Sequence, residues 1–197
     1  MEIDRLQALH RQLITMNNPE WAELVALRDS VQAEFASHGH LTSDTYYAVL
    51  DWKLRRQRNR TEKHRKGNPE ELIKELTGTF WRARHPNGGK ELEVKMKVLM
   101  AIPGIGLGVA SAILTLSTPD RFGIIDFRNW RVLYHEEKRN FSLSEYKRYL
   151  LDIRKLAHQL PASVQEIDYL LWKTFERLDE LPGSSGRPKS GPPGAPS

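Results

Sequence analysis

Residues 99–133 read LMAIPGIGLGVASAILTLSTPDRFGIIDFRNWRVL and form the most informative stretch of the chain. An apolar helix ends at Ala101-Ile102, a tight turn with two glycines follows at Pro103-Gly104-Ile105-Gly106, and an Ala- and Ser-rich helix begins at once. Glycine is needed where the backbone takes a positive φ or approaches a ligand closely. A turn that feeds a helix N-terminus also presents unpaired N–H groups, which suit a phosphate. The pattern predicts a helical hairpin that is either a tight corner or an anion contact.

Helical spacing dominates the rest of the sequence. Apolar residues recur at three- and four-residue steps, which is typical of amphipathic helices. We expect helices over 2–17, about 21–36, from a cap at 42–44, from 68–71, and at about 90–101, 107–117, 126–137, 142–159 and 163–180, with a loop over 85–89. No segment alternates with a period of two, so the sequence predicts an all-α protein without a sheet.

The domain organisation follows from composition. Residues 1–181 read as a single helical domain, in which the hairpin occupies about 90–117. Residues 182–197 are rich in Pro, Gly and Ser and are predicted to be a disordered tail.

Composition limits the kinds of chemistry that the chain can carry. The 197 residues have a net charge of +5 and no cysteine, which excludes disulfides, thiolate zinc sites, iron–sulfur clusters and cysteine nucleophiles. No apolar run approaches the ~20 residues needed to cross a bilayer, and the first residues do not resemble a secretory signal. We therefore expect a cytoplasmic protein with no membrane partner, associated with the nucleoid if it binds DNA.

Basic residues are concentrated in residues 53–66, which read KLRRQRNRTEKHRK with Glu62 as the only acid. Such a run is either a solvated face, an RNA or protein contact, or a phosphate contact. Aromatic residues precede it at Tyr46, Tyr47 and Trp52, and this favours nucleic acid because stacking and phosphate contacts often occur together.

Asp126 is the most notable acidic residue. It lies twenty residues after Gly106, follows Ile124-Ile125 and precedes a segment rich in Arg and Trp. Its position suits a helix N-cap, where the carboxylate accepts backbone N–H bonds. Considered alone, it reads as a simple cap.

The combination of P-G-I-G, a helix, an apolar pair, Asp126 and an aromatic–Arg helix resembles the helix-hairpin-helix DNA glycosylase superfamily, which includes endonuclease III and the adenine-mismatch, 8-oxoguanine and alkyladenine glycosylases. The resemblance covers about 35 residues closely. It implies two helical lobes flanking a cleft, a monomer, and a partner that is double-stranded DNA with a modified base flipped out of the helix.

The resemblance also implies residue roles. Gly104, Ile105, Gly106 and Gly108 would contact the DNA backbone, and the hairpin carbonyls sometimes hold a monovalent cation; no other cofactor and no metal site are expected. Asp126 would be the catalytic carboxylate of the segment 118–137, stabilising positive charge on the deoxyribose as the N-glycosidic bond breaks.

One departure from the family pattern concerns the nucleophile. Members that also cleave the strand carry a lysine two residues after the last glycine of the turn, and here that position is Gly108. The sequence therefore predicts a monofunctional glycosylase in which water attacks. Lys53, Lys95 and Lys97 are the possible substitutes, and the sequence selects none of them.

The base pocket is less well defined. Candidate pocket or DNA-contacting residues are Tyr46, Tyr47, Trp52, Lys53, Arg55, Arg56 and Arg128, of which each tyrosine fits core packing equally well. Arg128 replaces a family histidine and would either reach a phosphate or pair with an acid. Trp130 is expected in the core. The alternative function is a helix-hairpin-helix DNA-binding protein without catalysis, and the sequence does not identify the base.

Overall fold

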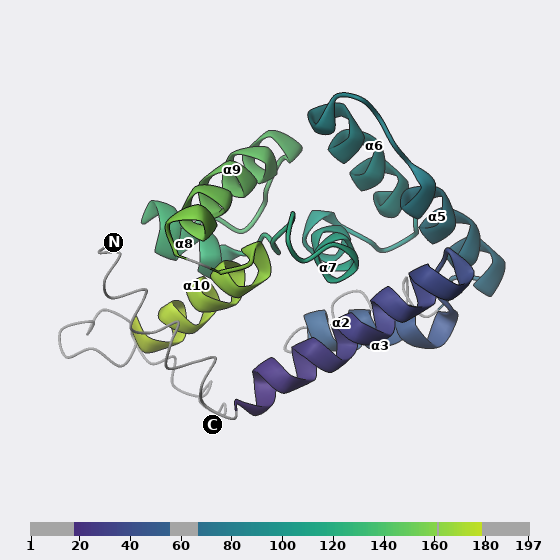
Figure 1. Cartoon of the computed structure of the whole chain (residues 1–197), viewed down its shortest axis with the longest axis horizontal. Helices are drawn as coiled ribbons and strands as arrows, with labels where there is room; N and C mark the ends of the chain where they lie inside the picture. Colours follow the sequence, from purple (N-terminus) through teal and green to yellow (C-terminus); the bar gives the residue numbers. More distant parts are fainter. Residues whose placement is uncertain (1–17, 56–66, 161, 179–197) are drawn as a thin grey trace, which may run out of the picture.

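A computed structural model describes residues 18–55, 67–160 and 162–178 (Figure 1). Within these ranges the chain forms eight helices and no strand, so the predicted all-α class is confirmed. The expected helix over 2–17, Arg56 with the rest of the basic run to residue 66, and the predicted tail lie outside the described residues. None of the described helices combines the length and the apolar character that a membrane crossing requires.

The helix bounds follow the periodicity and the capping residues. The helices are α2 (Pro19–His38), α3 (Ser43–Leu54), α5 (Glu70–Arg82), α6 (Gly88–Met100), α7 (Leu107–Ser117), α8 (Phe127–Tyr134), α9 (Leu143–Gln159) and α10 (Val164–Leu178). Side chains of Asn18, Thr42, Asn87 and Ser142 each accept a first-turn N–H bond. These bonds satisfy donors that the helix itself leaves unpaired.

Several helix boundaries differ from the sequence-based expectation by a few residues, and two of these differences have a clear local cause. The loop expected over 85–89 is shorter, because the Asn87 side chain accepts the Lys90 N–H at 3.0 Å and α6 already begins at Gly88. The helix expected to reach residue 137 ends at Tyr134, because His135 takes the left-handed conformation (φ 59°) and donates its N–H to the Arg131 carbonyl. A residue in this conformation ends a helix.

The helices pack in two groups, which Figure 1 shows on either side of the molecule. In the first helix group, α7 packs against α2, α3 and α6, and α5 packs against α3 and α6. In the second helix group, α10 packs against α8 and α9. Helix α7 has the most apolar composition, and nearly all of its residues are buried, which explains its place at the centre of the first group.

A buried extended segment, residues 122–125, joins the two groups. The N–H of Ile125 donates to Ser111 Oγ of α7 at 3.2 Å, and the N–H of Ile124 donates to Asp168 Oδ1 of α10 at 2.9 Å. Each group thus supplies a side chain that satisfies one backbone donor of the segment, as buried N–H groups require. Asp126, which directly follows this segment, therefore lies at the boundary between the two helix groups.

Candidate functional site

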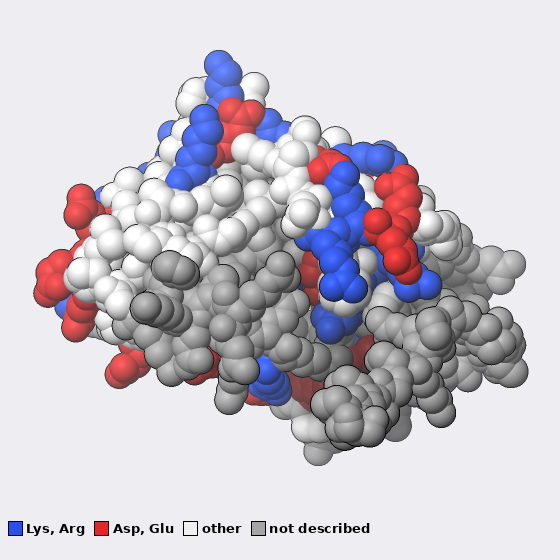
Figure 2. Space-filling view, turned by 180° about the vertical axis from the view of Figure 1, so that it is seen from behind, with Lys and Arg blue, Asp and Glu red and all other residues white. Residues whose placement is uncertain are grey.

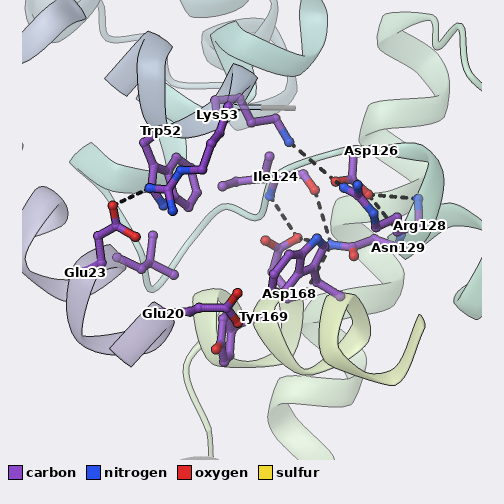
Figure 3. Close-up of a pocket in the computed structure, with 13 residues that line it drawn as sticks. Glu20, Glu23, Trp52, Lys53, Ile124, Asp126, Arg128, Asn129, Asp168 and Tyr169 are labelled. Atoms are coloured by element: carbon purple, nitrogen blue, oxygen red, sulfur yellow. Dashed lines mark hydrogen bonds and ion pairs between the residues drawn. The ribbon is translucent and has the colours of Figure 1, made fainter. Parts of the chain in front are cut away.

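A pocket of about 160 Å³ lies at this boundary (Figure 3). Both helix groups contribute to its wall: α2 and α3 from the first, α8 and α10 from the second, and the segment that precedes α8. The lining residues are Glu20, Glu23, Leu24, Trp52, Lys53, Arg55, Ile124, Asp126, Arg128, Asn129, Asp168, Tyr169 and Trp172.

Asp126 is the N-cap of α8 and lines the pocket. Its Oδ1 atom accepts the backbone N–H groups of Arg128 and Asn129 at 2.9 and 3.1 Å. These two bonds fix the orientation of the carboxylate, because Oδ1 is held by the first turn of the helix. The other oxygen, Oδ2, takes part in neither bond and faces two cationic side chains. Asp126 therefore combines a capping role with a preoriented carboxylate oxygen.

Lys53 reaches this oxygen from the first helix group. Its Nζ atom lies 3.5 Å from Asp126 Oδ2, and the two side chains are 15% and 17% exposed (Figure 3). The last turn of α3 places it there: Tyr46, Val49 and Leu50 are buried, and Lys53 continues the same helix face at the three- and four-residue steps. The lysine is thus directed into the molecule, so that the ion pair spans the pocket.

Arg128 provides the second cation. Its Nη1 atom lies 3.6 Å from Asp126 Oδ2, and its guanidinium lies 4.7 Å from the centre of the Phe127 ring and 6.0 Å from that of Trp172. Of the two roles left open for Arg128, pairing with an acid is the one seen. Aromatic faces also stabilise a guanidinium.

A second carboxylate, that of Asp168, lines the pocket from α10. Its Oδ1 atom accepts hydrogen bonds from Asn129 Nδ2 at 2.8 Å, from the Tyr149 hydroxyl and from the Ile124 N–H. Burial raises the pKa of Asp168 to about 7, because the charged form loses hydration, and the nearby charge of Asp126 acts in the same direction. The network ties α8, α9 and α10 to the segment that carries Asp126.

The remaining pocket wall mixes ion pairs and aromatic rings. Glu23 pairs with Arg55, and Glu20 pairs with Lys173 of α10. Trp52 and Trp172 line the pocket and are partly buried. The cavity therefore offers flat apolar surface next to charged groups, a combination that suits a planar heterocycle.

One residue of the hairpin turn, Gly104, has the positive φ that glycine favours. Gly104 is exposed and has φ 80°, whereas Gly106, the N-cap of α7, has φ −97° and ψ 176°. Ile105 is buried, and the Pro103 carbonyl accepts from Asn68 Nδ2 at 3.1 Å. The left-handed conformation explains Gly104, but the backbone of Gly106 is open to any residue.

The predicted site residues divide into those that meet at the pocket and those that do not. Trp52, Lys53, Arg55, Asp126 and Arg128 meet there. Tyr46 has no exposed surface, and neither it nor Tyr47 lines the pocket: the Tyr46 ring belongs to the core, and the Tyr47 hydroxyl donates to the Asn68 carbonyl.

Other predicted residues also have defined places. Trp130 is buried, as expected. Lys95 is buried and donates to the Phe80 carbonyl at 2.9 Å, and Lys97 is exposed. The contribution of α2 and α10 to the pocket was not predicted. A charged residue on the apolar face of a helix, as Asp168 is between Ile167 and Leu171, is the signal that identifies such positions.

The charged surface is mixed in the described part of the chain. On the face opposite to that of Figure 1, a group of Lys and Arg side chains lies directly beside Asp and Glu side chains (Figure 2). The net charge of +5 belongs to the whole chain, and residues 56–66, which lie outside the described residues, contribute six Lys and Arg against one Glu.

Comparisons with protein-family models, with curated proteins and with solved structures find no match for this chain.

Proposed function

We propose that this protein is a DNA glycosylase of base-excision repair, in which Asp126 is the catalytic carboxylate. The observation that carries the proposal is the position of Asp126 in the pocket wall, with Oδ1 held by two backbone N–H groups and Oδ2 beside Lys53 and Arg128. A carboxylate that is oriented before the substrate arrives is what an oxocarbenium-like transition state requires.

In the proposed reaction, a modified nucleotide leaves the DNA duplex and its base enters the pocket between the two helix groups. Flipping costs a few kcal/mol and favours bases that are already weakly paired. Trp52 and Trp172 would supply apolar surface to the base. As the N-glycosidic bond breaks, its electron pair leaves with the base, Asp126 stabilises the positive charge at C1′, and water adds to C1′.

The partner in this proposal is double-stranded DNA bound by a monomer. The hairpin from Pro103 to Gly108 would contact the phosphate backbone beside the lesion through N–H groups at the start of α7, which lack carbonyl partners within the helix. The resemblance of residues 99–133 to the helix-hairpin-helix glycosylases supports this part of the proposal.

The test uses end-labelled duplexes, each with one modified base, drawn from uracil, hypoxanthine, alkylated purines and oxidised guanine. Wild-type protein is compared with Asp126→Asn, and the products are analysed after alkali, which cleaves at abasic sites. We expect the wild type to create abasic sites in at least one duplex and Asp126→Asn to lower the rate by about 100-fold or more.

Asparagine is the matched replacement because it caps helices as well as aspartate does. Its side-chain oxygen keeps the acceptor for the Arg128 and Asn129 N–H groups, so the fold should be retained, and a lower unfolding midpoint is expected only from the lost charge beside Lys53 and Arg128. Equal rates for wild type and Asp126→Asn would contradict the assigned role of the carboxylate.

A non-catalytic helix-hairpin-helix DNA-binding protein is the second candidate. One observation favours it: the hydrogen bonds to Asp126 Oδ1 give this residue a structural role that needs no chemistry. This candidate predicts that wild type and Asp126→Asn bind duplexes equally well and that neither forms abasic sites on any of them.

A further inference from the structure

Lys53 is the only lysine among the described residues that line the pocket. Of the two other lysines that the sequence offers as nucleophiles, Lys95 is buried against the Phe80 carbonyl and Glu91, and Lys97 is exposed on α6. Burial lowers the pKa of Lys95 to about 8, which favours a reactive amine, but its Nζ atom lies in the interior of the first helix group. Access to the pocket therefore selects Lys53.

Two geometric features of the site suit an amine nucleophile at this place. The Asp126 Oδ2 atom, 3.5 Å from Nζ, is a proton acceptor next to the lysine. The Lys53 side chain is 15% exposed, so few water molecules compete with a substrate for its nitrogen. Both conditions apply to lysines that attack carbonyl carbons.

The position of Gly108 adds a third observation. A Cβ atom at this residue would lie 3.6 Å from the carbonyl oxygen of Ile125, the residue before Asp126. The place where the family pattern has its lysine thus adjoins the backbone of the segment that leads into Asp126, whose carboxylate Lys53 approaches from α3. Lys53 on α3 therefore supplies the amine that Gly108 does not provide.

We propose that Lys53 is the nucleophile of an abasic-site lyase activity, forming an imine with C1′ of the abasic deoxyribose that base excision leaves. The proposal rests on the proposed function, because it assumes that the abasic strand occupies this pocket. It also replaces the expectation, drawn from Gly108, that strand cleavage is absent.

The imine forms in balanced steps. The Lys53 ammonium gives one proton to Asp126 Oδ2, and the nitrogen lone pair attacks the aldehyde carbon C1′. The carbonyl oxygen receives two protons, one from Asp126 and one from the nitrogen, and departs as water, which leaves a protonated imine.

Strand cleavage follows from the imine. The Asp126 carboxylate takes a proton from C2′, and the electron pair of that C–H bond forms a C2′–C3′ double bond. The C3′–O bond breaks, and its electron pair leaves with the 3′ phosphate. No metal, oxidant or other reactant enters these steps.

The test uses a duplex with a preformed abasic site, so that no lesion base has to be known. Borohydride reduces an imine to a stable amine and traps the protein on the DNA. We expect wild type to be trapped, with the adduct mapped by peptide mass spectrometry to Lys53. Lys53→Arg, which keeps the charge but cannot form an imine, should fall to background, and Lys97→Arg should equal wild type.

Further readouts separate this proposal from the others. Binding to a duplex with a tetrahydrofuran abasic analogue, which has no aldehyde, should be similar for wild type and Lys53→Arg. If Lys53→Arg loses binding as well, the mapped wild-type adduct decides: an adduct on Lys53 supports the proposal. An adduct on any other residue, or no adduct, overturns the proposal. Base excision without trapping leaves the glycosylase proposal standing and refutes the nucleophilic role of Lys53. Trapping at Lys53 without base excision on any duplex supports the role of Lys53 and refutes the glycosylase proposal.

Discussion

Asp168 is a buried carboxylate that is held by three donors on one oxygen. The Ile124 N–H, the Asn129 amide and the Tyr149 hydroxyl all bond to Oδ1. These bonds favour the charged form, but loss of hydration outweighs them, and the pKa rises from 3.8 to about 7. The burial of Asp168 in the second helix group therefore lowers the free energy of unfolding by an amount that depends on pH.

This cost leads to a prediction about stability. Between pH about 4 and about 7 the Asp168 carboxyl ionises in the unfolded chain but not in the folded one, so the free energy of unfolding falls as pH rises and levels off above about 7. Asp168→Asn removes this group and keeps an acceptor for the same three donors. Relative to the variant, wild type should lose roughly 1 kcal/mol per pH unit in this interval.

Denaturant unfolding of both proteins across the interval measures the difference, and the other titrating groups cancel in it. The two curves of free energy against pH should diverge in favour of Asp168→Asn as pH rises. Parallel curves would show that the Asp168 carboxyl titrates near its ordinary value in the folded protein.

Three charged residues show how much of the site can be predicted from the sequence for single residues. Lys53, Lys95 and Asp168 each lie on the apolar face of a helix, at three- and four-residue steps from buried neighbours. The helical period places all three on the buried face, a signal that our prediction did not use, because it selected none of the lysines and gave Asp168 no role in the site. It does not indicate that Lys53 and Asp168 reach one pocket while Lys95 ends at the Phe80 carbonyl, because periodicity gives the face of a helix and not its partner.

At the scale of elements, the two glycines of the hairpin turn, Gly104 and Gly106, differ in their backbone conformation. Gly104 has φ 80°, and an alanine in this conformation costs about 1–2 kcal/mol. Gly106 has φ −97°, and a Cβ atom built there meets nothing within 4 Å. The φ of Gly106 does not require glycine, and glycine is also a favourable N-cap residue; whether a phosphate approaches the backbone here is therefore a question for a substitution.

Gly106→Ala consequently tests the hairpin as a phosphate contact. The free energy of unfolding should fall by no more than about 1 kcal/mol, because alanine is a poorer N-cap than glycine. Affinity for duplex DNA should fall about tenfold, because the methyl group displaces one hydrogen bond to a charged oxygen. Fluorescence anisotropy with a labelled duplex at fixed salt measures the affinity.

Gly88→Ala is the matched control, since Gly88 is exposed, has the same open surroundings and lies at the other end of α6. It should bind like wild type. If Gly106→Ala also binds like wild type, the hairpin is a structural corner and not a DNA contact.

The elements themselves were largely predictable because their signals are local. Asn18, Thr42 and Asp126 cap the helices that follow them, as their positions indicate. The end of α8 at Tyr134 was missed because a non-glycine residue, His135, takes the left-handed conformation there, which few non-glycine residues do. Such an ending depends on the contacts of the chain beyond the helix, which a local pattern does not contain.

At the scale of the whole molecule, the pocket depends on how two helix groups meet. Trp21 of α2 packs on Tyr169 of α10 with ring centres 4.9 Å apart, and Glu20 pairs with Lys173. Asp126 and Lys53 are 73 residues apart in the sequence but form an ion pair across the same boundary. Pairings of this range are not encoded in spacing, which is why the sequence named Asp126 and Lys53 separately but did not pair them.

A ligand that fills the pocket touches both groups, so it should stabilise the whole chain against unfolding. Binding at about 100 times Kd adds about 2.7 kcal/mol, and each kcal/mol raises Tm by roughly 2–4 °C for a chain of this size. A duplex with the tetrahydrofuran analogue should therefore raise Tm by several degrees more than an undamaged duplex of equal length. Salt weakens the backbone contacts common to both duplexes, so the two increases should shrink together while the analogue keeps its advantage. Equal increases at every salt concentration would mean that both duplexes are held by charge alone and that the flipped sugar never enters the pocket beside Asp126.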